Sequence, residues 1–279
     1  MSVSSTRPSV RILHQLARSG GTLISQCLGS MDGVLLLSEI HPYGASELNP
    51  FEKLRHRLNP LNQAIVWYRL FTPAELQELT QRQSVPFDEI MLMIEAKCRA
   101  RGLTLVVRDW THLDYVAAPF LPEASYRLTT AELLTERFDV IHTATVRHPL
   151  DQWLSLMEIK DMHDKFSLAD YLLGCRRFAE ECTRIGFLRY EDFVRAPQDV
   201  LRELCRRLQL DYDPEFIGKW PDNNRITGDR SGRGRDGREI RALPRRAVAP
   251  DLLDRFEAND DYRATLALLG YRHPEPGAE

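Results

Sequence analysis

Residues 16–23, "LARSGGTL", carry side chains suited to holding an anion. Gly20 and Gly21 allow a tight turn that presents backbone N–H groups. The helix expected to begin at Thr22 adds unsatisfied N–H groups and a positive dipole end, which stabilises a nearby anion by ~0.3–1 kcal/mol. Arg18 adds a full charge, and Ser19 and Thr22 add hydroxyl donors. This segment, called the glycine loop below, therefore predicts a phosphate cradle.

The glycine loop departs from the Walker A motif, G-x-x-x-x-G-K-[ST], in which a lysine meets the terminal phosphates and a hydroxyl meets magnesium. Gln15 stands where the first glycine would be, and no lysine follows Gly21. A magnesium-triphosphate site would also offer an acid after a neighbouring strand, but the apolar run 139–146 leads into Arg147. The loop is therefore expected to hold phosphate, and no metal is expected.

A second anion site is predicted from "TVRHPLDQWLS". Arg147 follows a buried strand, and Pro149 suits the first turn of a helix. Two helical turns bring Ser155 back toward the end of that strand. A guanidinium binds phosphate through a planar fork that lysine cannot copy, so Arg147 and Ser155 are expected to converge on a second anionic group.

The segment 225–246 holds eight arginines, four glycines and few acids. Such a composition is typical of a solvated loop, and the functional interpretation is a lid that orders over a second phosphate.

The elements that must position these residues alternate along the chain. Five short apolar runs read as buried strands: 10–16, 33–39, 103–107, 139–146 and 186–191. Helical patterns separate them, and two of the helices have capping signals at Thr72 and Ser167. The fold class predicted is α/β, with a central parallel sheet flanked by helices in the manner of P-loop kinases. One domain spanning 1–279 is expected, with a helical insertion at about 43–102.

These motifs, in this order, resemble those of the sulfotransferases that use 3'-phosphoadenosine 5'-phosphosulfate. "ARSGGTL" is similar to their 5'-phosphosulfate loop, and "VRHPLDQWLS" to their 3'-phosphate motif, with arginine and serine eight residues apart. "FLRYEDFVRAPQDVLRELCRRLQLDYDPEF" and "RSGRGRDGREIRALPRR" resemble a conserved segment and the glycine-arginine lid of the family. The resemblance implies a P-loop-like fold and transfer of a sulfuryl group to a hydroxyl or amine acceptor.

Carried over by position, the resemblance implies roles for individual residues. The nucleotide-binding residues would be Arg18, Ser19, Gly20, Gly21 and Thr22 at the 5'-phosphosulfate, Arg147 and Ser155 at the 3'-phosphate, and Arg230, Ser231, Gly232 and Arg233 in the lid. Many members have lysine where this chain has Arg18 and threonine where it has Gly21. Arg18 would also act in catalysis, because its charge lies near the bridging oxygen.

The acceptor must lose a proton, and a positioned general base contributes ~10²–10⁴-fold. Glu39 closes the second apolar run and resembles the glutamate of many carbohydrate and tyrosyl sulfotransferases. His112, in "RDWTHLD", resembles the histidine of the cytosolic enzymes. Glu39 is the first candidate for the general base, because "SEIHP" leads into an expected substrate loop. His112 is the second candidate and His41 the third. Asp109 lies within reach of the same edge.

Three aromatic residues, Trp67, Tyr68 and Trp110, are candidates for the acceptor pocket, although core packing is the common fate of such residues.

Composition narrows the other possibilities. The net charge of -3 argues against a general nucleic-acid surface. The five cysteines have no metal-ligand spacing, and neither a membrane span nor a signal segment is recognisable. A cytoplasmic enzyme with a small-molecule or carbohydrate acceptor is expected, and the acceptor's identity and the oligomeric state are not readable.

Two alternatives remain open on the sequence alone. One is a P-loop nucleotide kinase-like enzyme, and the other is a non-catalytic nucleotide-binding member of the fold.

Overall fold

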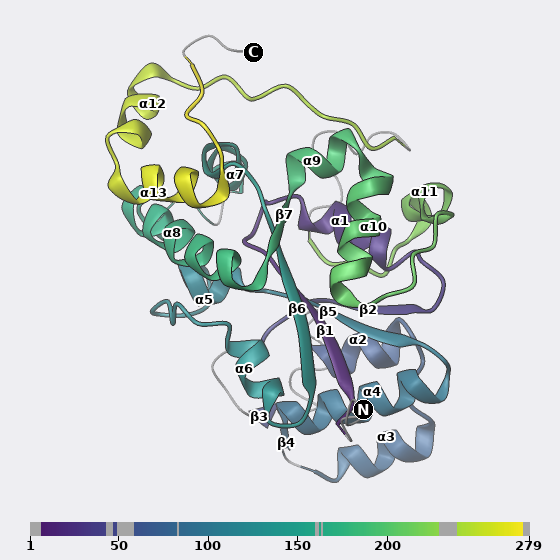
Figure 1. Cartoon of the computed structure of the whole chain (residues 1–279). Helices are drawn as coiled ribbons and strands as arrows, with labels where there is room; N and C mark the ends of the chain where they lie inside the picture. Colours follow the sequence, from purple (N-terminus) through teal and green to yellow (C-terminus); the bar gives the residue numbers. More distant parts are fainter. Residues whose placement is uncertain are drawn as a thin grey trace, which may run out of the picture.

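The computed structural model describes residues 7–42, 47–48, 59–82, 84–159, 162, 164–228 and 239–275. Its centre is a five-stranded sheet in the order β2-β5-β1-β6-β7, with every neighbouring pair parallel (Figure 1). The strands are β1 (Ser9–His14), β2 (Val34–Ile40), β5 (Thr104–Asp109), β6 (Asp139–Val146) and β7 (Phe187–Arg189). The predicted α/β fold class, a parallel sheet flanked by helices, is confirmed.

Both faces of the sheet are buried, because successive strand residues point to opposite sides. Leu13, Leu36 and Val106 belong to one core cluster, whereas the alternate residues Ile12 and Val107 belong to the other. This is why the strands read as continuous apolar runs in the sequence.

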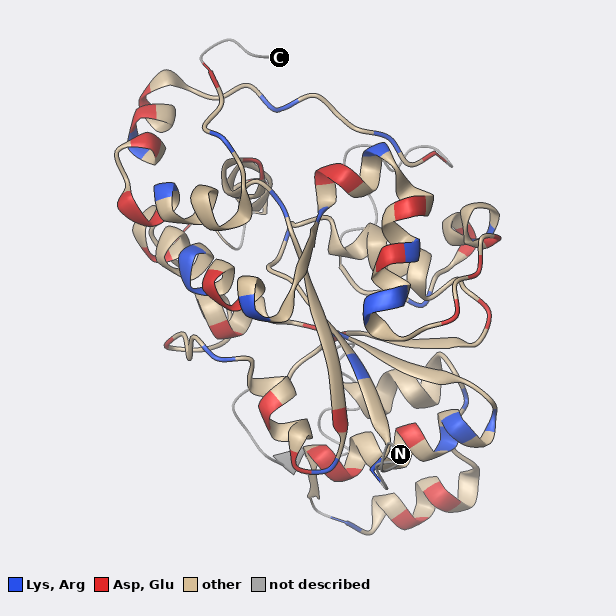
Figure 2. Cartoon of the chain, in the orientation of Figure 1, with Lys and Arg blue, Asp and Glu red and all other residues tan. Residues whose placement is uncertain are grey.

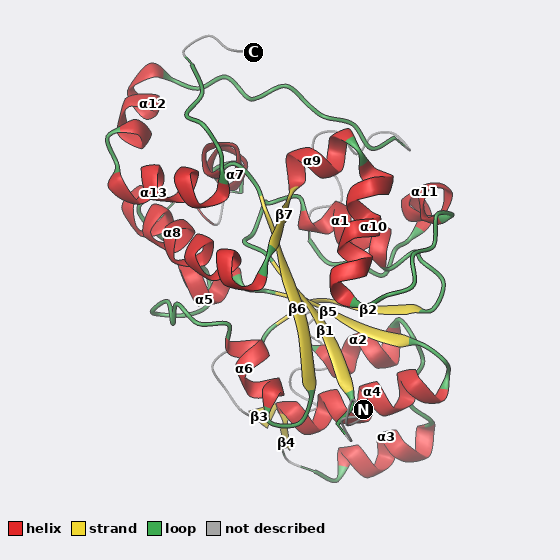
Figure 3. Cartoon of the chain, in the orientation of Figure 1, coloured by secondary structure: helices red, strands yellow, loops and turns green. Residues whose placement is uncertain are grey.

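Helices cover the two faces, as Figure 3 shows in red. The face of Leu13 is covered by α1 (Gly21–Leu28), α9 (Tyr190–Arg195), α10 (Pro197–Leu208) and α11 (Phe216–Lys219), followed by a 3-10 helix (Trp220–Asp222). The core on the other face includes residues of α2 (Pro60–Val66), α3 (Pro73–Thr80), α4 (Phe87–Ala100), α5 (His112–Val116), α6 (Thr129–Thr135), α7 (Pro149–Leu156), α8 (Leu168–Ile185), α12 (Pro250–Glu257) and α13 (Asp260–Leu269).

The stretch between β2 and β5 holds α2, α3 and α4. It also contributes a small antiparallel pair, β3 (Glu47–Leu48) and β4 (Val85–Pro86). Because β2 and β5 are neighbours in the sheet, this stretch leaves the sheet and returns beside its starting point. Its interpretation as an insertion within one domain remains a prediction.

Local signals in the sequence account for several element boundaries. Thr72 and Glu75 form both bonds of a capping box, and Ser167 and Asp170 do the same at the start of α8. The last strand is shorter than expected. It stops at Arg189, because Tyr190 already begins α9.

Charged side chains lie mainly on the helices and loops, while the strands are largely uncharged (Figure 2). Among the described residues, no helix combines the length and apolar character that crossing a membrane requires.

Candidate active site

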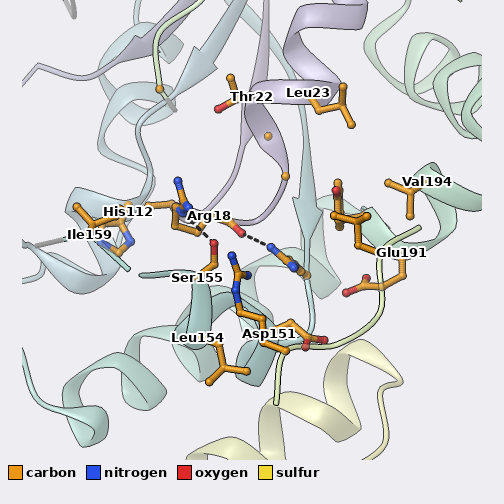
Figure 4. A pocket seen from close by; sticks show the side chains of 18 of the residues that line it. Arg18, Thr22, Leu23, His112, Asp151, Leu154, Ser155, Ile159, Glu191 and Val194 are labelled. Carbon is orange, nitrogen blue, oxygen red and sulfur yellow. Dashed lines mark hydrogen bonds between the residues drawn. The ribbon is translucent and has the colours of Figure 1, made fainter. Parts of the chain in front are cut away.

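A cavity of about 810 Å³ opens where the strands end at their carboxyl termini. Ligands of parallel α/β sheets bind at this edge. The glycine loop, the connection from β5 to α5, helix α7 and the start of α9 supply its walls (Figure 4). The described segment 239–246 lines it as well. This segment and the three residues after it run as an extended strap to α12 (Figure 1).

The two glycines of the loop meet different requirements. Gly20 has a φ of +83°, and a Cβ there would lie 2.0 Å from the ring of Tyr190. A Cβ on Gly21 would lie 1.6 Å from the side-chain amide of Gln15. The loop therefore needs glycine because Tyr190 and Gln15 pack directly against its backbone, and helix α1 starts immediately after this turn.

The two predicted anion sites meet in one place. Arg18 Nε donates to Ser155 Oγ at 2.9 Å, and Arg147 Nη1 donates to the carbonyl oxygen of Arg18 at 3.1 Å (Figure 4). The Arg147 guanidinium also lies over the ring of Tyr190, 5.2 Å from its centre. Arg18, Arg147 and Ser155 all line the cavity, so the tertiary structure brings together residues 137 positions apart in the chain.

Ser19 differs from the sequence prediction of a hydroxyl that faces phosphate. Its side chain is buried, and Oγ donates to the carbonyl oxygen of Leu16 at 2.7 Å. Because this bond closes the loop from inside, Ser19 shapes the turn, whereas Thr22 lines the cavity.

Arg108 is a cavity residue that the sequence reasoning missed. It is the fifth residue of β5, and its side chain is buried at the cavity wall. Its Nη2 donates to Thr22 Oγ1 at 3.2 Å and lies 3.1 Å from Glu39 Oε1. The available signal was an arginine inside an apolar strand, a position that is rarely charged unless the charge is paired.

Arg108 also reaches the segment that leads into the basic loop. Its Nη1 donates to the carbonyl oxygen of Thr227 at 3.1 Å and to Ser38 Oγ at 3.2 Å. Burial lowers the pKa of Arg108, while the charge of Glu39 raises it in part. The buried Arg108 guanidinium thus contacts the Thr22 hydroxyl of the glycine loop, the Glu39 carboxylate and the backbone carbonyl of Thr227.

Glu39 sits where β2 ends, and the pairing with β5 shifts register between Ser38 and Ile40. Its φ is +57°, an unusual backbone conformation for a residue other than glycine. The side chain is 17% exposed, lines the cavity and is ion-paired with Arg108. The carboxylate is therefore already held by a cation.

His112 lies next to Arg18 and beside Ile159 (Figure 4). The imidazole is 1% exposed, and neither ring nitrogen has a hydrogen-bond partner among the described residues. Burial lowers the pKa of His112 to about 3. The cavity wall therefore holds a buried, neutral imidazole whose nitrogens are bonded to no other described residue.

Asp109 and His41 are buried and do not line the cavity. Asp109 Oδ2 lies 2.8 Å from His14 Nδ1, and its two oxygens accept from Thr111 and Thr130. Burial by itself would raise the pKa of Asp109, but its contacts with His14 lower it overall. His41 Nε2 lies 3.3 Å from Asp114 Oδ1.

Two arginines of the strap are fastened to α7, the helix that carries Ser155. Arg245 binds Asp151 through two bonds of 2.7 and 2.8 Å, and Arg246 binds Glu158 just beyond the helix through bonds of 2.8 and 2.6 Å. The lid residues expected at Arg230, Ser231, Gly232 and Arg233 lie outside the described residues.

Of the three aromatic candidates, Trp110 lines the cavity. Tyr68 instead donates its hydroxyl to the carbonyl oxygen of Leu36, and Trp67 packs against Tyr68.

The fold and the cavity define a class of parallel α/β protein whose sheet edge is lined with arginines and hydroxyl groups. The comparison with known families is specific. The model of the sulfotransferase family matches residues 16–214, so this chain belongs to the sulfotransferase family.

Solved structures show the same fold. The sulfotransferase domain from the curacin biosynthetic pathway superimposes with a TM-score of 0.62 at 18% identity, covering 97% of this chain and 100% of that one. The sulfotransferase domain of the Synechococcus PCC 7002 olefin synthase gives a TM-score of 0.62 at 20% identity, covering 98% and 99%. No curated protein sequence matches the chain significantly.

Proposed function

We propose that this protein transfers the sulfuryl group of 3'-phosphoadenosine 5'-phosphosulfate to a hydroxyl or amine of a small acceptor. The observation that carries the proposal is the direct bond from Arg18 to Ser155 within one cavity. The donor has an anionic group at each end of its nucleoside, and the two predicted anion sites share this cavity. Its volume of about 810 Å³ falls within the usual range for small-molecule sites.

The residues present fit such a donor. Gly20 and Gly21 leave no room for a Cβ, so the backbone stays tightly turned at the start of α1. The N–H groups at this helix start and the charge of Arg18 suit the phosphosulfate end. Arg147 and Ser155 suit the 3'-phosphate, because a guanidinium and a hydroxyl both donate to phosphate oxygens.

His112 is the proton acceptor that the contacts favour, ahead of Glu39. The Glu39 carboxylate is already engaged by the Arg108 guanidinium, whose Nη2 lies 3.1 Å from Glu39 Oε1. No described residue forms a hydrogen bond with the nitrogens of His112, and an anionic donor beside the imidazole would raise its pKa. This reverses the order of the two candidate bases that was expected from the sequence. Glu39 and Arg108 would then position Thr22 and the glycine loop.

The transfer balances without a further reactant. The acceptor oxygen or nitrogen forms a bond to sulfur while the bond from sulfur to the phosphate oxygen breaks. The acceptor's proton passes to a ring nitrogen of His112. Arg18 stabilises the negative charge that grows on the leaving phosphate oxygen, which is the electrostatic role of a fixed donor in group transfer.

Thermal unfolding with nucleotides tests the donor site. 3',5'-Adenosine bisphosphate should stabilise the protein by ~2.7 kcal/mol at a hundredfold excess over Kd, and AMP should stabilise it much less. Arg147→Ala should weaken bisphosphate binding by ~1.5–3 kcal/mol, the value of a hydrogen bond to a charged group. Equal stabilisation by AMP and the bisphosphate would remove the basis for the 3'-phosphate site.

Thermal unfolding and an assay of sulfuryl transfer together separate the two alternative functions. A P-loop kinase-like enzyme would instead be stabilised by ATP with magnesium. A non-catalytic member would bind the bisphosphate but transfer no sulfuryl group to any acceptor.

A further inference from the structure

We infer that the acceptor is a compound with an apolar body and a single hydroxyl, rather than a sugar. The inference rests on the proposed function and concerns the apolar wall of the cavity beside Arg18. The described residues of this wall are Trp110, His112, Pro119, Phe120, Leu154, Ile159 and Met162.

The wall is built from two elements that meet at Arg18. The connection around α5 supplies Trp110, His112 and Phe120, and the end of α7 with the residues after it supplies Leu154 and Ile159. In Figure 4, His112 and Ile159 lie together beside Arg18, whereas Glu191 and Val194 lie on the far side of the cavity. The wall therefore adjoins the position at which the sulfuryl group would be transferred.

Aromatic surface extends along this wall to the outside. The rings of Trp110 and Phe120 meet edge to face, with centres 5.2 Å apart. Phe120 is nonetheless 52% exposed, so much of its ring faces water. An apolar body that covers this ring would remove its surface from water, which is favourable in proportion to the area buried.

The described wall offers one polar side chain that can accept a proton, the imidazole of His112. A single acceptor hydroxyl can donate a hydrogen bond to one ring nitrogen of His112, which gives both groups a partner. The several hydroxyls of a sugar ring would face apolar side chains, and buried polar groups without partners oppose binding. The chemistry of the wall therefore selects a phenol or an aliphatic alcohol.

Four probes test this selection in the presence of the donor. The rate of bisphosphate release is measured with 1-naphthol and 1-octanol as apolar acceptors and with glucose and N-acetylglucosamine as sugars. Calorimetry with 3',5'-adenosine bisphosphate already bound measures the binding of the same four compounds. We expect at least one apolar probe to bind and to turn over at least tenfold faster than either sugar.

A matched pair of variants ties the preference to this wall. Phe120→Ser should raise KM for the apolar acceptor at least tenfold, because the ring that the acceptor covers is gone. It should leave the Kd of the bisphosphate unchanged. Ile217→Ser removes a side chain that is 40% exposed on α11, away from the cavity, and should change neither value.

The outcomes are distinguishable. If the bisphosphate binds and the sugars are sulfonated as fast as 1-naphthol, or if neither apolar probe binds, the acceptor inference is overturned while the donor proposal stands. An unchanged KM in Phe120→Ser would also overturn it. If the bisphosphate itself does not bind, the proposed function fails first.

Discussion

At the scale of single residues, the site depends on which polar groups already have partners. Glu39 near the end of β2 and His112 after β5 both line the cavity, yet Glu39 is ion-paired and the His112 nitrogens have no hydrogen-bond partner among the described residues. Sequence position makes them equivalent candidates. Their contacts make them different, because the Glu39 carboxylate is already occupied by the Arg108 guanidinium.

Replacing each candidate base measures this difference. His112→Asn should lower kcat at least ~10²-fold, the lower end for a positioned base, with little change in the Kd of the bisphosphate. Glu39→Gln should lower kcat less. The measurement is the rate of sulfonation of whichever of the four probe acceptors reacts fastest. A larger loss of kcat in Glu39→Gln than in His112→Asn would show that Glu39 is the general base.

The Arg108–Glu39 ion pair should couple the stability effects of its two residues. Arg108→Met leaves a carboxylate without its cation, and Glu39→Gln leaves a buried guanidinium without its anion. The double variant removes both charges. In urea unfolding, the double variant should therefore be less destabilised than the sum of the singles by ~0.5–3 kcal/mol. Strict additivity would show that the two groups act independently.

At the scale of elements, the glycine loop is held by packing against its backbone as much as by its own turn. The side chains of Gln15 and Tyr190 occupy the space where a Cβ would project from Gly21 and Gly20. Gln15 is buried, and its side-chain oxygen, in the orientation that satisfies both groups, accepts from Arg108 Nη2 at 3.0 Å. The loop, β5 and α9 are therefore fitted to one another.

A single added methyl group tests this fit. Gly20→Ala should destabilise the protein by ~1–3 kcal/mol and weaken bisphosphate binding, because its φ is +83° and a Cβ there would lie 2.0 Å from the Tyr190 ring. Gly218→Ala is the matched control, since a Cβ there meets nothing within 4 Å and its φ is not positive. Equal melting temperatures for the two variants would contradict the packing argument.

At the scale of the whole molecule, the C-terminal helix is fastened to the element that carries Tyr190. Arg189 Nε donates to the carbonyl oxygen of Leu269 at 2.9 Å, and the Tyr271 hydroxyl donates to Glu191 Oε2 at 2.7 Å. Glu191 Oε1 accepts from the backbone N–H of His148 at 2.9 Å. Residues from the end of the chain thus support the cavity without lining it.

Buried histidines should make the folded protein sensitive to acid. Burial lowers the pKa of His112 to about 3, that of His142 to about 4, helped by repulsion from His14, and that of His148 to about 4. The unfolded chain, with histidine pKa near ~6.5, binds more protons between these values. The stability that these histidines contribute is therefore complete above pH ~6.5 and falls as the pH drops toward 4.

Urea unfolding as a function of pH measures this loss. The free energy of unfolding should decrease by at least ~2 kcal/mol between pH 7 and pH 4.5, since each unit of pKa difference corresponds to ~1.4 kcal/mol. His112→Asn should flatten the slope, whatever its effect on absolute stability. A variant slope equal to that of the parent protein would show that His112 does not titrate in this way.

The sequence by itself determined the strands and several helix starts, and it supplied the candidate anion-binding groups. Apolar runs marked all five strands of the sheet, and the capping boxes at Thr72 and Ser167 formed as predicted. These signals are local, because strand burial and helix capping act within a few residues. The spacing of Arg147 and Ser155 was likewise local, since one helix separates them.

Only the tertiary structure decided which groups meet. The bond between Arg18 and Ser155 and the reach of Arg108 to Glu39 and Thr22 depend on strand order. Strand β5 lies between β1 and β2 in the sheet, so Arg108 stands between the two loops that follow those strands. No short sequence pattern predicts these contacts of Arg108, because they arise from the order of the strands in the whole sheet.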